Sequence, residues 1–144
     1  MSDNKLTSEL LQAIVERLNT LTTTAPDIEF AFVFSSAGEP IAHSKLWDNA
    51  PDLKAISPML AEMAATSVEL VHKLRLRELP PTEPFYEHII FMKSSDGYVV
   101  IMPINHIYWL TSVVRYHSML GVIMLDSYRA SDDLAKLLPS TPSP

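Results

Sequence analysis

The residue types that most often carry out chemistry occur in this chain, but their spacing matches no catalytic or metal-binding motif. Its five histidines show no HExxH or other metal-ligand spacing; they are His43, His72, His88, His106 and His117. The serine pairs at 35–36 and 94–95 lie just before glycines and fit turns, because no GxSxG nucleophile elbow occurs. The chain contains no cysteine, which excludes thiolate nucleophiles, thiolate metal ligands and disulfides. We therefore expect no enzyme activity, no metal and no cofactor.

The charged residues also lack a catalytic arrangement. Asp126, Asp132 and Asp133 fit a solvated helix face, and the last two point in different directions because they are sequential. Neither a Walker-type loop nor a GxGxxG motif is present, so the sequence does not support nucleotide binding by this chain. The formal net charge of −6 disfavours nucleic-acid binding, which needs a basic face to neutralise phosphates.

One basic cluster is the exception to this acidic balance. It consists of Lys73, Arg75 and Arg77 in the segment HKLRLRE. Cations at the C-terminal end of a helix complement the helix dipole, which is the simpler explanation. The alternative is a docking patch for an acidic partner, so we treat these three residues as candidate partner-binding residues.

The sequence favours a cytoplasmic location. The absence of cysteine fits a reducing compartment. The first residues, MSDNKLTSELLQ, lack the basic start and the uninterrupted apolar stretch of a signal peptide. No apolar run approaches the ~18 residues that a membrane-spanning helix needs, so we expect no direct membrane insertion.

The elements that would position these residues follow from the hydrophobic spacing. Residues 4–22 carry apolar residues at helical spacing, which predicts an amphipathic helix that ends at the threonines that follow. The segment IEFAFVFSSAGEPIAHS predicts a strand, a turn at Gly38 and a short second strand over residues 41–44. Pro40 places this second strand at a sheet edge, because proline cannot donate to a neighbouring strand. On the first strand we expect one shared face for Ile28, Phe30, Phe32 and Phe34.

Residues 52–74 predict a second helix. Asp48 or Asn49 would cap it, and Ser57-Pro58 would give it a later start or a kink. Its apolar stripe, widened by Met63 and Leu70, consists of Leu60, Ala64, Ser67, Val71 and Leu74.

The second half of the chain predicts a three-stranded meander and a closing helix. An apolar run at 85–93 is followed by the turn SSDG and the run YVVIMPI, and Asp96-Gly97 favours a type I′ hairpin turn between them. The run IYWLTSVVRY adds a third strand. The meander strands are apolar on both faces, so helices or a second subunit should cover both sides of the sheet. The closing helix over residues 120–138 has as expected core residues Leu125, Tyr128, Leu134 and Leu138.

The composition is that of an ordinary globular protein. Of the 144 residues, 47% are apolar and 19% are charged. We expect one domain over residues 1–138 and an unstructured proline- and serine-rich tail over residues 139–144.

The element order, with these turns, resembles the roadblock (dynein light-chain) family. The stretches that carry the resemblance are APDIEFAFVFSSAGEPIAHS, SSDGYVVIMPI, IYWLTSVV and SMLGVIMLDSYRASDDLAKLL. The resemblance implies an α+β fold in which a five-stranded antiparallel sheet lies between the middle helix and the two terminal helices, as in roadblock/profilin-like proteins. It also implies a non-catalytic adaptor, similar to bacterial and archaeal regulators of the family, that binds a Ras-like small GTPase as an activator or a scaffold.

The resemblance further implies a dimer formed through the middle helix and the edge strand that follows it. We expect a homodimer, with a heterodimer with a paralogue as the alternative. An exposed apolar edge strand is an aggregation hazard unless it is paired, which agrees with this expectation. The implied interface residues are Leu60, Met63, Ala64, Ser67, Val71, Phe85, His88 and Ile90.

Other functions stay open at the level of sequence. They are a structural light-chain subunit of a larger complex, a small-ligand-sensing module, and an enzyme of unrecognised type. Two features depart from the family pattern: Pro40 interrupts the second strand, and Ser57-Pro58 would shorten the middle helix. If the chain accelerates GTP hydrolysis, Arg75 and Arg77 are the candidates for an arginine finger, although repositioning of the GTPase's own residues is the favoured mechanism.

Overall fold

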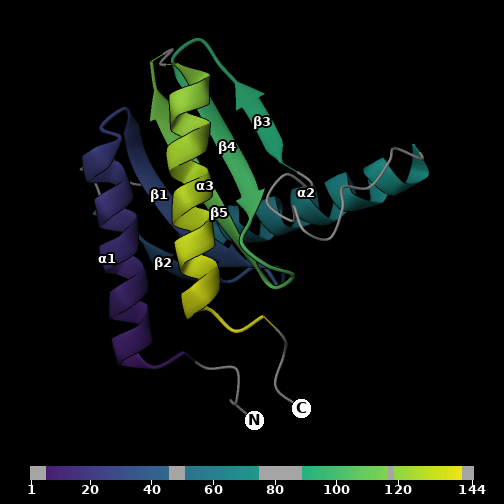
Figure 1. Cartoon of the computed structure of the whole chain (residues 1–144). Helices are drawn as coiled ribbons and strands as arrows, with labels where there is room; N and C mark the ends of the chain where they lie inside the picture. The colour runs from purple at the N-terminus through teal and green to yellow at the C-terminus, as the bar shows by residue number, and fades with distance from the viewer. Residues whose placement is uncertain (1–5, 46–50, 75–88, 117–118, 141–144) are drawn as a thin grey trace.

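The computed structural model describes residues 6–45, 51–74, 89–116 and 119–140. Within these residues the element order is α-β-β-α-β-β-β-α (Figure 1). The elements are α1 (Ser8–Thr24), β1 (Ile28–Ser35), β2 (Pro40–His43), α2 (Leu53–Lys73), β3 (Ile90–Lys93), β4 (Gly97–Pro103), β5 (Tyr108–Arg115) and α3 (Leu120–Leu137). All strand pairs are antiparallel, and the order across the sheet is β2-β1-β5-β4-β3. The predicted fold class and the edge position of β2 are confirmed.

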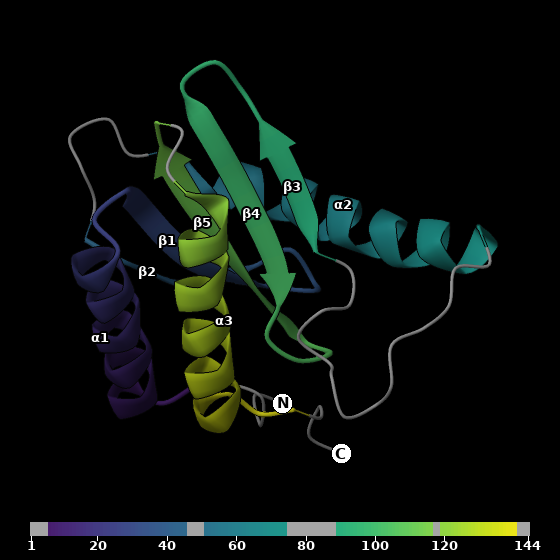
Figure 2. The same cartoon turned by 45° about the horizontal axis from the view of Figure 1, so that its top comes forward.

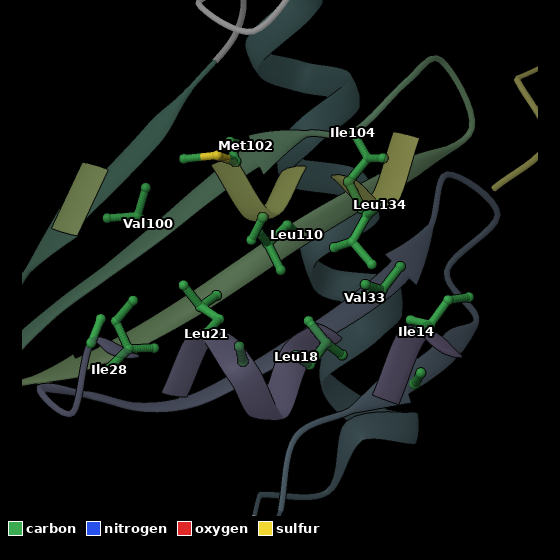
Figure 3. Close-up of a cluster of buried hydrophobic side chains, with 14 of the residues drawn as sticks. Ile14, Leu18, Leu21, Ile28, Val33, Val100, Met102, Ile104, Leu110 and Leu134 are labelled. Carbon is green, nitrogen blue, oxygen red and sulfur yellow. The ribbon is translucent and has the colours of Figure 1, made fainter. Parts of the chain in front are cut away.

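Helices cover both faces of the sheet. α1 and α3 lie side by side on one face, and α2 crosses the other (Figures 1 and 2). A larger core, which includes Leu18, Val100 and Leu134, fills the space between the sheet and α1 and α3 (Figure 3). A smaller core under α2 contains Phe32 and Leu60. Two cores are needed because successive strand residues point to opposite faces, and these strands are apolar on both.

A hydroxyl group caps the start of α1, and further hydroxyls lie in its last turn. The Thr7 hydroxyl oxygen accepts a hydrogen bond from the N–H of Leu10 at 3.1 Å and caps the helix. The helix continues past residue 22 to Thr24. The hydroxyls of Thr23 and Thr24 donate to carbonyl oxygens one turn earlier, at 2.8 and 2.9 Å, so both residues lie within the helix that we expected them to end.

A bulge in β1 changes one predicted facing. The register between β1 and β5 shifts between Ile28 and Phe30. Phe30, Phe32 and Phe34 therefore share one face, as predicted, and this face meets α2. Ile28 instead packs into the core under α1 and α3. The prediction that Ile28 shares their face is wrong, because one extra residue in a strand reverses the alternation beyond it.

The predicted hairpin between β3 and β4 is present, but its glycine has another role. The N–H of Ser94 donates to the carbonyl oxygen of Gly97 at 2.8 Å. Asp96 does not have the positive φ that a type I′ turn requires, so that turn type is wrong. Gly97 instead lets β4 approach β5 closely, since a Cβ at this position would lie 2.0 Å from the carbonyl oxygen of Val114.

α2 has a different cap from the one predicted. The side chain of Asp52 accepts a hydrogen bond from the N–H two residues later at 3.1 Å, so the helix begins at Leu53; residues 48 and 49 lie outside the described residues. Pro58 lies inside the helix and does not end it. Gly38, with a φ of +87°, packs its backbone against Pro58 from the β1–β2 turn.

α3 buries a different face from the one predicted. Leu134 and Leu138 are buried as expected, but Leu125 is 48% exposed and is not a core residue. The helix approaches the sheet through Ser127 and Ser131, which are fully buried. Small side chains here permit close packing, and the Ser131 hydroxyl donates to a backbone carbonyl of β4 at 2.9 Å. Among the described residues, no helix is long and apolar enough to cross a membrane.

Candidate protein–protein interface

α2 runs past the edge of the sheet. In both views its C-terminal half extends beyond β3 (Figures 1 and 2). Exposure rises along the predicted apolar stripe, from 6% at Leu60 through half-buried Ser67 and Val71 to 60% at Leu74. Leu60 and Ala64 are covered by their own sheet, so the part of the stripe that a partner can reach begins at Ser67.

The projecting half of α2 is apolar on one side and polar on the other. Val68 and Leu70 are exposed and flank the stripe, with Leu70 at 53%. The opposite side carries the exposed polar residues Glu62, Thr66 and Glu69. A helix segment surrounded by water is usually polar all round. The apolar side, which continues the side that packs on the sheet, therefore indicates a covering partner.

β3 presents an open edge beside this helix. It pairs with β4 on one side and, among the described residues, ends the sheet on the other. Ile90 packs towards α2, and Met92, two residues further on the same face, is exposed. The backbone groups of an open edge pair readily with another strand. We define the α2–β3 surface by the residues Val68, Leu70, Val71, Leu74 and Met92.

α2 also leaves part of its face of the sheet uncovered. A hollow of about 360 Å³ lies near the β3–β4 turn. Its lining includes the apolar side chains of Met92, Val99 and Val113, with Lys93 and Arg115 also lining it. Val99 and Val113 are only partly buried in the core that α2 covers. The hollow can therefore take a further apolar element.

The structure describes some of the predicted site residues and not others. Four of them lie outside the described residues: Arg75, Arg77, Phe85 and His88. Met63 is half-buried and packs into the core under α2. Lys73 is exposed, and its Nζ atom lies 2.8 Å from Oε1 of Glu69 one turn earlier. Exposed pairs of this kind contribute about 0.5 kcal/mol or less, so Lys73 is held only weakly. The structure brings Ser67, Val71 and Ile90 to the same side of the sheet.

Sequence reasoning missed Val68 and Met92. Val68 follows Ser67 directly, so it falls outside a single stripe at i+3 and i+4 spacing. The available signal was the group of apolar residues at positions 68, 70, 71 and 74, which is wider than one stripe. Such a width indicates a helix that is covered on more than one side.

The pKa shifts of the titratable groups have structural causes. Burial raises the pKa of Tyr98 and of Tyr108, and nearby Asp27 and Glu39 add to the respective shifts. The side-chain hydrogen bond to Glu29 raises the pKa of Arg115. Each shift stabilises the protonated form of its group. All three groups therefore stay protonated near neutral pH. Within the described residues, no group of three or more potential ligands could hold a metal ion.

A hollow at the opposite end of the sheet bears on the small-ligand alternative. Its volume is about 540 Å³, and residues of the start of α1, the β1–β2 turn and the β4–β5 turn line it. The Ser36 hydroxyl in this lining already donates to the carbonyl oxygen of Ile107 at 3.1 Å. Tyr108 is buried there with a raised pKa. The Ser36 hydroxyl is thus already engaged within the chain.

Solved structures of the same fold define the class of this protein. MglB in a structure with a tetrameric arrangement superposes with a TM-score of 0.76 at 17% identity, over 94% of each chain. Myxococcus xanthus MglB gives a TM-score of 0.74 at 19% identity, over 87% of this chain and 94% of that one. A roadblock/LC7 domain from Streptomyces avermitilis gives 0.54 at 16% identity, over 83% of this chain and 96% of that one. The sequence matches no protein-family model and no curated protein.

The chain therefore has the roadblock fold, which confirms the fold that the resemblance predicts. Within that class, its backbone is more similar to the two MglB structures than to the roadblock/LC7 domain.

Proposed function

We propose that this chain is a non-catalytic, cytoplasmic regulator of a Ras-like small GTPase and that it acts as a homodimer. The observation that carries the proposal is the α2–β3 surface, where an apolar helix end and an open strand edge lie side by side (Figure 2). The surface lies on the two elements through which the roadblock resemblance implies dimerisation.

Each copy has an open edge at β3 and an uncovered apolar side on the end of α2, and a second copy can cover both. Two copies related by a two-fold axis beside β3 would join their sheets edge to edge, and the same residues would serve on both sides. The projecting half of α2 in each copy would then lie over the sheet of the other. The hollow beside Met92, Val99 and Val113 supports this arrangement, because it needs an apolar cover at that place. A tetrameric arrangement of MglB shows that a protein of this fold can self-associate.

Regulation of a GTPase is supported by the likeness to MglB and by the implications of the roadblock resemblance. We keep Lys73, at the end of α2, as a candidate partner-binding residue, together with Arg75 and Arg77, which lie outside the described residues. If the chain activates its partner, we infer that it repositions the GTPase's own catalytic residues. Arg75 and Arg77 are the candidates for a direct contribution to the transition state. If it does not activate, the same contacts would make it a scaffold.

The experiment is a pull-down with the purified full chain from its native cell extract, loaded in parallel with GDP or a non-hydrolysable GTP analogue. Mass spectrometry then identifies the bound proteins. We expect one small GTPase enriched in one nucleotide state. A large complex recovered equally in both states would contradict regulation and favour a structural light chain. If no protein binds in either state, both functions are contradicted.

A further inference from the structure

A second exposed apolar surface lies at the start of α3, on the other face of the molecule. Met119 is 77% exposed, Val122 52% and Leu125 48%, and Leu120 and Tyr116 beside them are also exposed. We call these residues the α3 surface. The sheet separates it from the α2–β3 surface, because α3 and α2 cover opposite faces (Figures 1 and 2).

The fold of one copy does not use the outer side chains of α3. The helix buries a complete row of other residues against the sheet. Val122 and Leu125 are one turn apart on the outer face. Further along the same face, Arg129 and Lys136 are exposed charges. The outer face of α3 is thus apolar in its first half and charged in its second half.

Gly121 marks a place where another backbone can come close. A Cβ at this position would meet nothing within 4 Å in its own copy. Glycine is less favourable than alanine in a helix, so a helical glycine usually has a turn or a close approach as its reason. Neither exists for Gly121 within the described residues of one copy. A second helix crossing at this point would supply the reason.

Tyr116 is held at the surface in a strained conformation. Its φ of +67° lies in the left-handed region, which bulky residues rarely adopt. The N–H of Tyr116 donates to the carbonyl oxygen of Asp96 at 2.6 Å and fixes this conformation. Strain of this kind is typical of functional contacts. It presents an aromatic ring to solvent at the border of the α3 surface.

The charges around α3 indicate which partner fits. At the end of β5, before α3 begins, Nε of Arg115 binds Oε2 of Glu29 at 2.5 Å. The backbone N–H of Arg115 donates to the backbone carbonyl oxygen of Asp27 at 3.1 Å. Asp96 also acts on Arg115 and helps to raise its pKa. The carboxylates of Glu29 and Asp96 thus both act on one guanidinium. In the second half of α3, Arg129 lies 3.9 Å from its nearest carboxylate, which is a weak contact.

We propose that the α3 surface binds the α3 surface of a second copy, with the two helices antiparallel. If Val122 of one copy lies against Leu125 of the partner subunit, symmetry makes the same contact twice. At a rise of 1.5 Å per residue, Arg129 then lies about 8 Å beyond the two-fold axis, towards the end of the partner subunit where Glu29 and Asp96 act on Arg115. Gly121 faces the partner's helix and lets the two axes approach.

Both self-association surfaces can be occupied at once, because they lie on opposite faces. Homodimers that use the α2–β3 surface would join through α3 into tetramers and, at higher concentration, into longer assemblies. The α3 contact does not depend on the α2–β3 contact or on a GTPase.

The test is sedimentation velocity of the full chain from low micromolar to the highest soluble concentration. We expect species larger than a dimer to grow with concentration. Leu125→Glu places a charge in the α3 surface and should weaken this step at least tenfold, because a buried leucine is worth about that factor or more. Gln12→Glu, which adds the same charge at an exposed position of α1, is the matched control and should behave as the unmodified chain.

Gly121→Ala gives a second, independent readout. It should weaken the α3 contact while leaving the melting temperature unchanged or raised, since alanine favours a helix and its Cβ meets open space. The proposal is overturned if the unmodified chain never exceeds a dimer, or if Leu125→Glu and Gly121→Ala associate as it does. In either outcome, the chain can still form a dimer. If Leu70→Glu breaks that dimer, the proposed α2–β3 homodimer is supported even though the α3 contact is not. The Leu70→Glu chain can also be compared with a chain that carries both Leu70→Glu and Leu125→Glu. If both form the same dimer, the α3 contact is overturned as well.

Discussion

At the scale of single residues, two glycines that look alike in the sequence have opposite surroundings. A Cβ on Gly97 would lie 2.0 Å from a backbone oxygen of β5, whereas a Cβ on Gly121 would meet open space. Backbone cannot move aside as a flexible side chain can. We therefore expect Gly97→Ala to lower the free energy of unfolding by more than about 2 kcal/mol.

Urea denaturation measures this difference, and Gly121→Ala at a concentration that keeps the chain in its smallest species is the control. The control should be unchanged or more stable by up to about 1 kcal/mol. Equal stability of Gly97→Ala and the unmodified chain would show that β4 does not approach β5 as closely as described.

Tyr108 should make stability depend on alkaline pH. Burial raises its pKa, and Glu39 adds to the shift. The folded state thus holds the phenolic proton more tightly than the unfolded state does. The contribution is complete below the unfolded pKa of about 10 and is lost as the pH rises through the folded pKa.

We expect the free energy of unfolding to fall above about pH 10, and to fall less steeply in Tyr108→Phe. Tyr98 is shifted in the same direction, so the variant removes only part of the slope. Urea denaturation at a series of alkaline pH values gives both slopes, and identical slopes would contradict the assignment.

Residue-scale features were the least predictable from the sequence. The Asp96-Gly97 pair predicts a hairpin, and the hairpin exists, but a glycine needed for a close approach cannot be told from one needed for a turn. The cap of α2 was placed too early because residues 48 and 49 and Asp52 all carry suitable side chains.

At the scale of elements, the projecting half of α2 is the feature with the clearest consequence. Leu70→Glu places a charge on its apolar side, and Gln12→Glu adds the same charge at an exposed position of α1. We expect Leu70→Glu to weaken the α2–β3 homodimer at least tenfold, because it both removes apolar burial and buries a charge. Gln12→Glu should leave the dimer unchanged.

Sedimentation velocity on both variants, each also carrying Leu125→Glu to remove the α3 contact, isolates this step. The dimer assignment fails if the two variants have the same mass. A circular dichroism spectrum of each variant would show whether the helices are retained.

The positions of the elements were predictable where periodicity was strong. Helices and strands occur in the predicted order, since each apolar face has a partner in the sandwich. The facings of Ile28 and Leu125 were not predictable in the same way. A bulge in β1 turns Ile28 to the other face of the sheet. On α3, the small residues Ser127 and Ser131 are buried against the sheet, whereas the sequence pattern had favoured larger apolar residues at the core positions.

At the scale of the whole molecule, the two apolar faces of the meander predicted a sandwich, and the structure has one. The overhang of α2 was not predictable, because it depends on how the helix crosses a sheet whose width and edges arise from distant pairings. That overhang, rather than the buried Leu60 and Ala64, is what a second copy can reach.

On the proposed function, this chain binds a small GTPase with an affinity that depends on the bound nucleotide. The most direct measurement is calorimetric titration of the purified full chain with the GTPase recovered from the pull-down, loaded with GDP or with a non-hydrolysable GTP analogue. We expect at least a tenfold difference in Kd between the two states, which corresponds to about 1.4 kcal/mol. Equal affinities, or no binding in either state, would contradict the proposed function.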